Sequence, residues 1–190
     1  MHTINTKEKI IIIYNIKNER LEIVKKLAKE KQFEIIEVED NQTYCVVEDI
    51  LNKDTSHCID NSATNIDMEF LLFVNIVNDE LYGFIDELKK EDLYFPNKAI
   101  LTPTNLKWKL RRLLAENKEE HIVMTMFTNL RRAMKRAHIL VENDESDEEL
   151  LELMEEAKHY LNPREFDFDE MKSIHNRLAI KVNELHESEK

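Results

Sequence analysis

IIIIY, residues 10–14, and FLLFV, residues 70–74, are the two runs that decide the fold of this chain. Each is an unbroken apolar stretch of strand length, which is typical of a strand buried on both faces of a sheet. Two further strands are expected near residues 33–38 and 99–101, where the apolar runs are mixed or short. We therefore expect the two apolar strands at the centre of one sheet and the other two at its edges.

Helical patterns alternate with these four strands. Apolar residues recur every three or four positions over residues 21–28 and again over residues 81–88. This alternation predicts an α/β fold with a small parallel sheet covered by helices, and right-handed crossovers give the strand order 2-1-3-4. The alternative is a ferredoxin-like βαββαβ sheet, in which residues 44–67 would form a hairpin connection. The sequence shows no evident internal repeat.

A change of pattern after about Lys118 predicts an all-helical C-terminal extension. Three apolar stripes with helical spacing follow, separated by breaks near residues 142–145 and at Asn162-Pro163. Ser146 followed by Glu149 predicts a capping box at the second helix, and Pro163 is expected to end that helix. We therefore expect a small α/β domain over residues 1–118 and a three-helix extension over residues 119–190.

The composition argues against several classes of protein. The chain has 190 residues and a formal net charge of −12, which disfavours non-specific binding to nucleic acid or to an anionic membrane. No apolar run approaches the roughly 20 residues of a membrane span, and residues 1–8 lack a signal-peptide layout. Two cysteines, Cys45 and Cys58, are too few for a disulfide framework, so we expect a cytoplasmic protein.

The scarcity of glycine excludes most nucleotide-binding loops. Gly83 is the single glycine of the chain, whereas dinucleotide loops, P-loops and nucleophile elbows all need glycine where the backbone takes a positive φ or touches phosphate. Cys45, His57 and Cys58 lack the paired ligand spacing of zinc sites. An ordinary loop and a buried thiol are the simpler interpretation, so the sequence predicts no cofactor and no metal.

Two adjacent segments carry opposite charge. Residues 107–136 hold nine Lys or Arg against three Glu, and residues 142–156 hold nine acids and no base. Neighbouring blocks of opposite sign pair with each other more often than with a third partner. We therefore expect the cations near Arg131 and Arg136 to offset the acidic block, leaving no basic patch for nucleic acid.

The segment from Lys98 to Trp108 is the clearest candidate for a ligand site. A short strand runs there into a Thr-Pro-Thr-Asn turn that opens a helix. In an open parallel sheet, ligands bind at the carboxyl ends of the strands, near the point where the strand order reverses. The tentative ligand-binding residues are Tyr14, Asn15, Asn75, Thr102, Thr104 and Asn105. The alternative is structural: Thr104 or Asn105 caps the helix and Pro103 stiffens the turn.

The chain also resembles a known family over about residues 10–121. The resemblance is carried by the opening Ile10–Asn15, by Asn78–Leu81, by Lys98–Asn105 with Trp108, and by Glu119-Glu120-His121. The Thr-Pro-Thr-Asn turn is the specific part. These residues resemble the bacterial family of domains of unknown function (DUF) numbered 3783, and the resemblance brings no known activity.

The sequence favours a non-catalytic interaction or regulatory module over an enzyme. The six polar candidates include no nucleophile–base pair, so recognition suits them better than catalysis. A protein partner or self-association is expected through the C-terminal helices, with a homodimer slightly favoured. The tentative interaction surface consists of Met124, Met126, Phe127, Arg131 and Arg132. The alternative function is a small-molecule sensor or an enzyme that uses the crevice at the strand ends.

Overall fold

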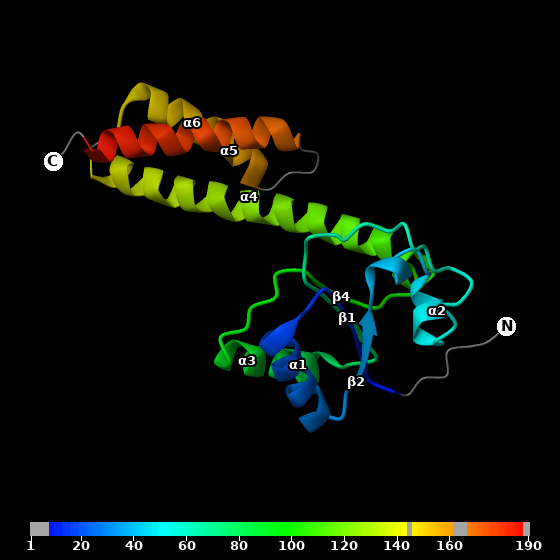
Figure 1. Cartoon of the computed structure of the whole chain (residues 1–190). Helices are drawn as coiled ribbons and strands as arrows, with labels where there is room; N and C mark the ends of the chain where they lie inside the picture. Colours follow the sequence, from blue (N-terminus) through cyan, green and yellow to red (C-terminus); the bar gives the residue numbers. More distant parts are fainter. Residues whose placement is uncertain (1–7, 144–145, 162–166, 188–190) are drawn as a thin grey trace. The chain divides into compact units, whose positions relative to one another are not determined.

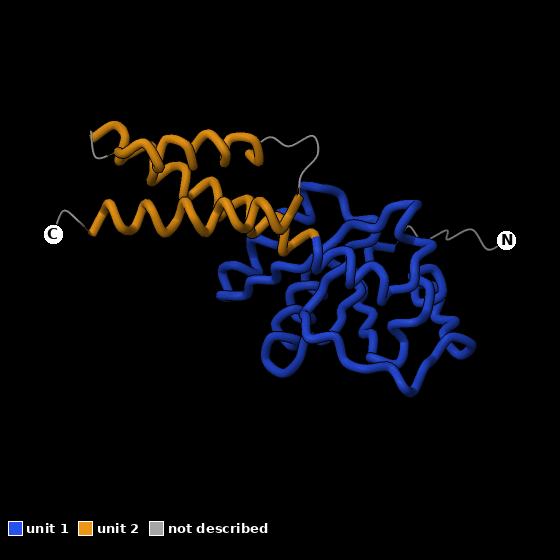
Figure 2. The backbone as a smooth tube through the Cα atoms, turned by 90° about the horizontal axis from the view of Figure 1, so that it is seen from above, with its two compact units in different colours: residues 1–119 blue, residues 120–190 orange. Residues whose placement is uncertain are grey.

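The computed structural model describes residues 8–143, 146–161 and 167–187 (Figure 1). In chain order the elements are β1 (Ile10–Tyr14), α1 (Asn18–Glu30), β2 (Glu34–Val38), the 3-10 helix η1 (Asp40–Gln42), α2 (Val47–Leu51), β3 (Phe70–Val74), α3 (Asn78–Lys90), β4 (Lys98–Ile100), the 3-10 helix η2 (Asn105–Lys107), α4 (Leu110–Glu142), α5 (Glu148–Leu161) and α6 (Phe168–Glu187). They divide into two compact units, residues 1–119 and 120–190, coloured separately in Figure 2. We call these the α/β unit and the helical unit.

The α/β unit is built on one four-stranded sheet with the order β2-β1-β3-β4. This confirms the predicted order and the central position of the two apolar strands. The predicted parallel pairing of these central strands is wrong, because β1 and β3 run antiparallel, with Ile10 opposite Val74 and Tyr14 opposite Phe70. The outer pairs β1–β2 and β3–β4 are parallel, so the sheet is mixed.

The connection between β2 and β3 explains the reversal. The Tyr14 hydroxyl, at the end of β1, contacts both Asp40 and Ile66, so the chain on both sides of α2 remains at that end of the sheet. α2 has five residues and spans only about 7.5 Å, whereas a five-residue strand spans about 17 Å. The chain therefore enters β3 from the end where β2 finishes and runs back.

Both faces of the sheet are covered by apolar side chains. Ile11, Ile13, Leu71 and Phe73 point to the face on which α1 and α3 lie side by side. The alternate residues of the same strands point to the opposite face, where α2 and the first turns of α4 pack. Burial on both faces is the physical reason why the central strands contain no polar residue except the Tyr14 hydroxyl.

An internal repeat becomes visible in the structure, contrary to our expectation from the sequence. β3 follows β1 by 60 positions, and α3 follows α1 by the same 60, with equal lengths. The backbone repeats as well: Asn15 and Asn75 both have φ of 55°, while Gln32 and Asp92 have 59° and 56°. The antiparallel register is symmetric about the pair Ile12–Leu72. The two βαβ halves are thus related by a pseudo-twofold axis through the sheet.

The helical unit contains the continuation of α4 together with α5 and α6. Its core consists of Leu130, Met134, Ala137, Leu150, Leu153, Ala157, Met171, Ile174, Leu178 and Val182, among others. α4 is one continuous helix of 33 residues, so the helix that follows Trp108 continues without a break past the expected change of pattern at Lys118. Asp147 rather than Ser146 caps α5, since its Oδ1 accepts a hydrogen bond from the Leu150 amide at 2.9 Å. Pro163 lies outside the described residues.

Among the described acids of the block, Asp147, Glu149 and Glu156 pair with α6 and not with the α4 cations as predicted. Lys181 binds both Asp147 and Glu149, and Arg177 binds Glu156 at 2.8 Å. In the described part of the chain, Arg131 and Arg132 are exposed and have no ion pair. The sequence argument failed because it paired neighbouring segments, whereas α6, farther along the chain, supplies the cations. No helix in the described ranges is long and apolar enough to cross a membrane.

Candidate functional site

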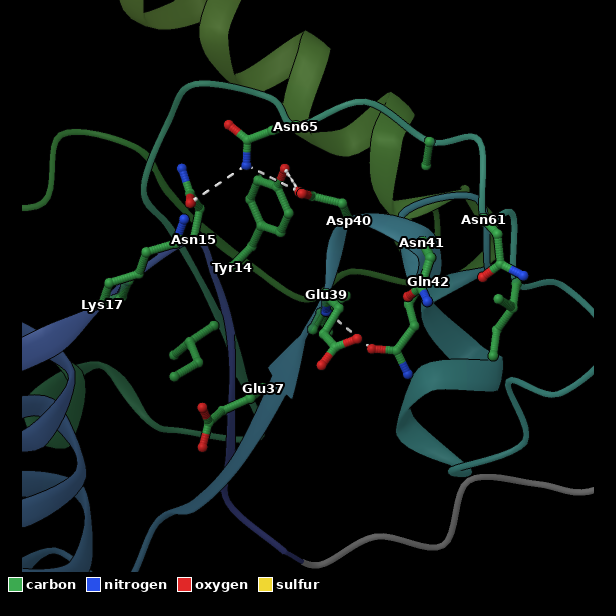
Figure 3. Close-up of a pocket in the computed structure, with 15 residues that line it drawn as sticks. Tyr14, Asn15, Lys17, Glu37, Glu39, Asp40, Asn41, Gln42, Asn61 and Asn65 are labelled. Atoms are coloured by element: carbon green, nitrogen blue, oxygen red, sulfur yellow. Dashed lines mark hydrogen bonds between the residues drawn. The ribbon is translucent and has the colours of Figure 1, made fainter.

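A pocket of about 820 Å³ opens at the carboxyl ends of β1 and β2. The end of β1, the segment that follows β2, and the loop after α2 form its walls (Figure 3). Its lining residues are Ile13, Tyr14, Asn15, Ile16, Lys17, Glu37, Val38, Glu39, Asp40, Asn41, Gln42, Ile59, Asn61, Ala63 and Asn65. The site therefore follows the general rule that places ligands beyond the carboxyl ends of parallel strands.

Tyr14 organises one wall of the pocket. Its hydroxyl donates a hydrogen bond to Asp40 Oδ1 at 2.6 Å and accepts one from the Ile66 amide at 2.8 Å. Asn65 donates to the same Asp40 oxygen at 3.0 Å and lies 3.5 Å from the side-chain oxygen of Asn15 (Figure 3). This network holds the loop after α2 against the end of β1.

The environment of Tyr14 raises the pKa of its phenol to about 12, first through burial and then through the hydrogen bond to Asp40. Because the folded pKa exceeds the unfolded value of 10.0, the stabilisation by Tyr14 is complete below pH 10 and is lost as pH rises toward 12. We expect Tyr14→Phe to remove one of two late-ionising tyrosines from a spectrophotometric titration.

The other late-ionising tyrosine is Tyr160, whose pKa is raised to about 12 mainly by a hydrogen bond to Glu170. Tyr160→Phe is the matched control, since it removes one late step without touching the pocket. If all tyrosines of the Tyr14→Phe protein and of the unchanged protein titrate alike, the hydrogen-bonded network of the pocket is wrong.

The loop after α2 is fastened at several points. Cys58 forms a disulfide with Cys45, the Asp60 amide donates to the Asn41 carbonyl at 2.8 Å, and Arg111 donates to Thr64 at 3.3 Å. The sequence predicts a mobile loop here because the segment is polar and aperiodic. Its contacts with distant residues, which no local pattern encodes, instead make it a wall of the pocket.

Most of the polar side chains that line the pocket can accept hydrogen bonds. Glu37, Glu39 and Asp40 supply carboxylates, whereas Lys17 is the one cation among the described lining residues. The Asn41 side-chain oxygen is buried and has no hydrogen-bond partner. A buried acceptor without a partner costs free energy.

The structure separates the six predicted ligand residues into two groups. Tyr14 and Asn15 line the pocket. Asn75 lies at the opposite end of the sheet, where its amide donates to the Glu8 carbonyl at 3.2 Å, and Thr102, Thr104 and Asn105 follow β4 at that same end. The expected crevice between β1 and β3 does not form, because these strands are antiparallel and their carboxyl ends point apart.

The Thr-Pro-Thr-Asn turn is stabilised by Asn105. The Asn105 side-chain oxygen accepts from the Thr102 amide at 2.7 Å, and its amide nitrogen donates to the Ile100 carbonyl at 3.0 Å. Its backbone amide donates to the Thr102 hydroxyl at 3.1 Å. Asn105 is buried and its side chain is occupied on both sides, which supports the structural interpretation of this turn.

The five predicted interaction residues also divide. Met126 and Phe127 pack against the core of the helical unit. Met124 is 54% exposed, and Arg131 and Arg132 are exposed as well. Met124, Arg131 and Arg132 are therefore the more exposed of the five, and the role of all five in binding a partner stays a prediction.

Sequence reasoning missed most of the pocket. Glu37, Glu39, Asp40, Asn41 and Gln42 form a polar run at and just after the end of β2. Since β2 is parallel to β1, the rule that selected Asn15 would also have selected this run. Asn61 and Asn65 had no such signal, because their position depends on the path of the loop.

Comparison with known proteins adds one finding. Neither the curated proteins nor the solved structures provide a match to this chain. Residues 69–124 match the family model described as Domain of unknown function (DUF3783). The matched segment runs from the start of β3 through α3, β4 and the Thr-Pro-Thr-Asn turn into α4. The resemblance read from the sequence is therefore confirmed over residues 69–124, and the match does not extend to residues 10–68.

Proposed function

We propose that this chain is a non-catalytic regulatory module of the cytoplasm. In this proposal the α/β unit binds a small polar ligand in the pocket at the ends of β1 and β2, and the helical unit, acting as a separate domain, makes the protein contact. The observation that carries the proposal is the polar lining of this pocket, which holds three carboxylates and one lysine among the described residues.

The polarity of the pocket defines the class of ligand. Carboxylates and amide oxygens accept hydrogen bonds, so they favour a neutral or cationic molecule with several amine or hydroxyl groups. A phosphate or a nucleotide would bring negative charge next to Glu39 and Asp40, and like charges in a partly dehydrated site repel. The proposed ligand is therefore a small amine or polyol.

Binding without catalysis fits the residue types. No Ser, Cys or His is among the described residues that line the pocket, so a serine, cysteine or histidine nucleophile is missing from the described lining. The Tyr14 hydroxyl donates its hydrogen bond to Asp40 and so fixes the position of that carboxylate in the pocket. These groups can orient a ligand, which is the requirement for a sensor.

The helical unit is proposed to mediate self-association or binding of a protein partner. Large apolar side chains are exposed along all three of its helices: Ile122, Met124, Ile139, Leu151 and Ile180, each between 47% and 58% exposed. Sedimentation at two protein concentrations tests self-association. A monomer at both concentrations would leave a different protein as the only partner allowed by the proposal.

Thermal denaturation with defined ligands tests the pocket. Spermidine, putrescine and glucose represent amines and polyols, and ATP represents the anions that the pocket should reject. A ligand at 100 times its Kd stabilises the folded state by about 2.7 kcal/mol, which raises Tm by several degrees. We expect at least one amine or polyol to produce such a shift and ATP to produce none.

Asp40→Asn and Asn41→Ala are the informative variants, and Asp86→Asn is the matched control because Asp86 is an exposed carboxylate on α3. The two pocket variants should abolish the ligand-induced shift, and the control should retain it. A shift that survives in both pocket variants, or the absence of any shift with amines and polyols, contradicts the proposed function.

A further inference from the structure

Four side chains with metal-binding atoms gather on one side of α2, outside the pocket described above. Cys45 lies just before α2, Asp49 lies within it, and His57 and Cys58 lie in the loop that follows. One ligand atom from each of Asp49, His57 and Cys58 falls within 4.8 Å of the others. Cys45 joins this group because its sulfur is bonded to that of Cys58.

We propose that Cys45, Asp49, His57 and Cys58 bind one Zn²⁺ ion when the disulfide is reduced. A dithiol gives two electrons and two protons to the Cys45–Cys58 bond, becomes a disulfide itself, and leaves two protein thiols. Both thiols then lose a proton as the metal binds, because the thiolate is the ligand form. The bonded and the metal-bound states exclude each other, since both use the same two sulfur atoms.

The donor set suits zinc. Two thiolates, one imidazole and one carboxylate are all ligands that Zn²⁺ accepts, and four ligands complete its preferred tetrahedron. With Zn–S of about 2.3 Å and Zn–N of about 2.0 Å, neighbouring ligand atoms in a tetrahedron lie roughly 3.3–3.8 Å apart. The three clustered atoms, all within 4.8 Å of one another, need to close by about 1.5 Å at most, and the two sulfurs need to separate after reduction.

The orientation of His57 supports this assignment. Its Nε2 lies 3.3 Å from Asp49 Oδ2, inside the cluster, while its Nδ1 faces Asp54 Oδ1 at 3.7 Å. A zinc-binding histidine characteristically offers one nitrogen to the metal and donates the other N–H to a carboxylate. Asp54 therefore occupies the place of the outer carboxylate, and it is not itself counted as a ligand.

The proposed ligands differ in their exposure to solvent. Cys45 is fully buried, and both sulfurs lie near the Thr55 carbonyl, Cys58 at 3.2 Å and Cys45 at 3.8 Å. His57 is 56% exposed on its side chain. A metal can thus reach the site from the solvent side, through His57, while the protein anchors it from within through Cys45.

Cobalt substitution of the full-length protein tests the site directly. Reduced protein, kept in a phosphine reductant, is titrated with Co²⁺, whose visible bands are strong in tetrahedral sites and whose near-ultraviolet band reports thiolate bonds. We expect both bands to saturate at one equivalent of Co²⁺ and to disappear when Zn²⁺ is added. Protein in which the disulfide is intact should develop neither band.

Variants separate the proposed site from incidental metal binding. Cys58→Ser should remove the thiolate band or weaken it at least tenfold in affinity, and Asp49→Asn should also weaken binding while preserving shape. Asp54→Asn should reduce the affinity about tenfold to a hundredfold, as for other outer carboxylates. His159→Ala, an exposed histidine on α5, is the matched control and should bind as the unchanged protein does.

Three results would overturn the proposal. The first is reduced protein without thiolate-to-cobalt absorption, the second is equal affinity in the reduced and the disulfide-bonded forms, and the third is binding that Asp49→Asn and Cys58→Ser leave unchanged. The conservative Asp49→Asn and Asp54→Asn variants keep the test valid if loss of a cysteine prevents folding, which circular dichroism would reveal.

Discussion

Phe84→Ala is expected to lower the free energy of unfolding of the α/β unit by about 3–5 kcal/mol, the usual cost of deleting a buried aromatic ring. Phe84 lies on α3 and is completely buried. Its ring contacts those of Phe33 and Phe73 edge to face, with centroids 5.7 Å and 6.1 Å away. Removing it opens a cavity where both βαβ halves and the sheet meet.

Tyr82→Ala on the same helix is the matched control. Tyr82 is 62% exposed, so its removal should change the free energy of unfolding by about 0.5 kcal/mol or less. Urea denaturation monitored by circular dichroism measures both. Equal effects of the two substitutions would show that α3 presents a different face to the sheet.

Leu178→Ala is expected to destabilise the helical unit by about 2–5 kcal/mol. Leu178 lies on α6, is fully buried, and belongs to a core that contains residues of α4 and α5. Because this core shares no buried residue with the two cores of the α/β unit, the loss should appear in the unfolding of the helical unit alone.

Ile180→Ala is the control for this substitution. Ile180 is 58% exposed on the same helix, and its loss should be close to neutral. Denaturation is followed by the fluorescence of Trp108, in the α/β unit, and by far-ultraviolet circular dichroism, to which the helical unit contributes most. If Leu178→Ala shifts the Trp108 transition as much as the circular dichroism transition, the two units unfold together.

Local patterns predicted the elements well and their directions poorly. The runs IIIIY and FLLFV could be recognised as central strands because burial on both faces demands such residues. The direction of β3 could not be read from FLLFV itself. Residues 39–69 connect β2 to β3, and the path of this connection decides the end of the sheet from which β3 starts. That path is fixed by contacts between distant residues, such as the one between Tyr14 and Ile66.

The residues of the candidate site were likewise predictable only where they did not depend on strand direction. Asn15 lines the pocket because it directly follows an identifiable strand, and its role in binding a ligand stays a prediction. Asn75 was chosen by the same argument and lies at the other end of the sheet, since the argument assumed parallel strands. Three of the zinc ligands proposed above, Cys45, His57 and Cys58, were set aside because they lack paired zinc spacing. The fourth, Asp49, was not considered, because it enters the cluster through the turn of α2.

The pseudo-twofold axis through Ile12 and Leu72 has an evolutionary consequence. A symmetric sheet with matching lengths and matching left-handed residues is what results when a gene segment for one βαβ unit is duplicated and fused. Before fusion, two separate copies would have made the same antiparallel contact as a dimer. The DUF3783 segment contains the second copy with the start of α4, whereas the pocket and the cysteine pair belong to the first copy and the loop that follows it.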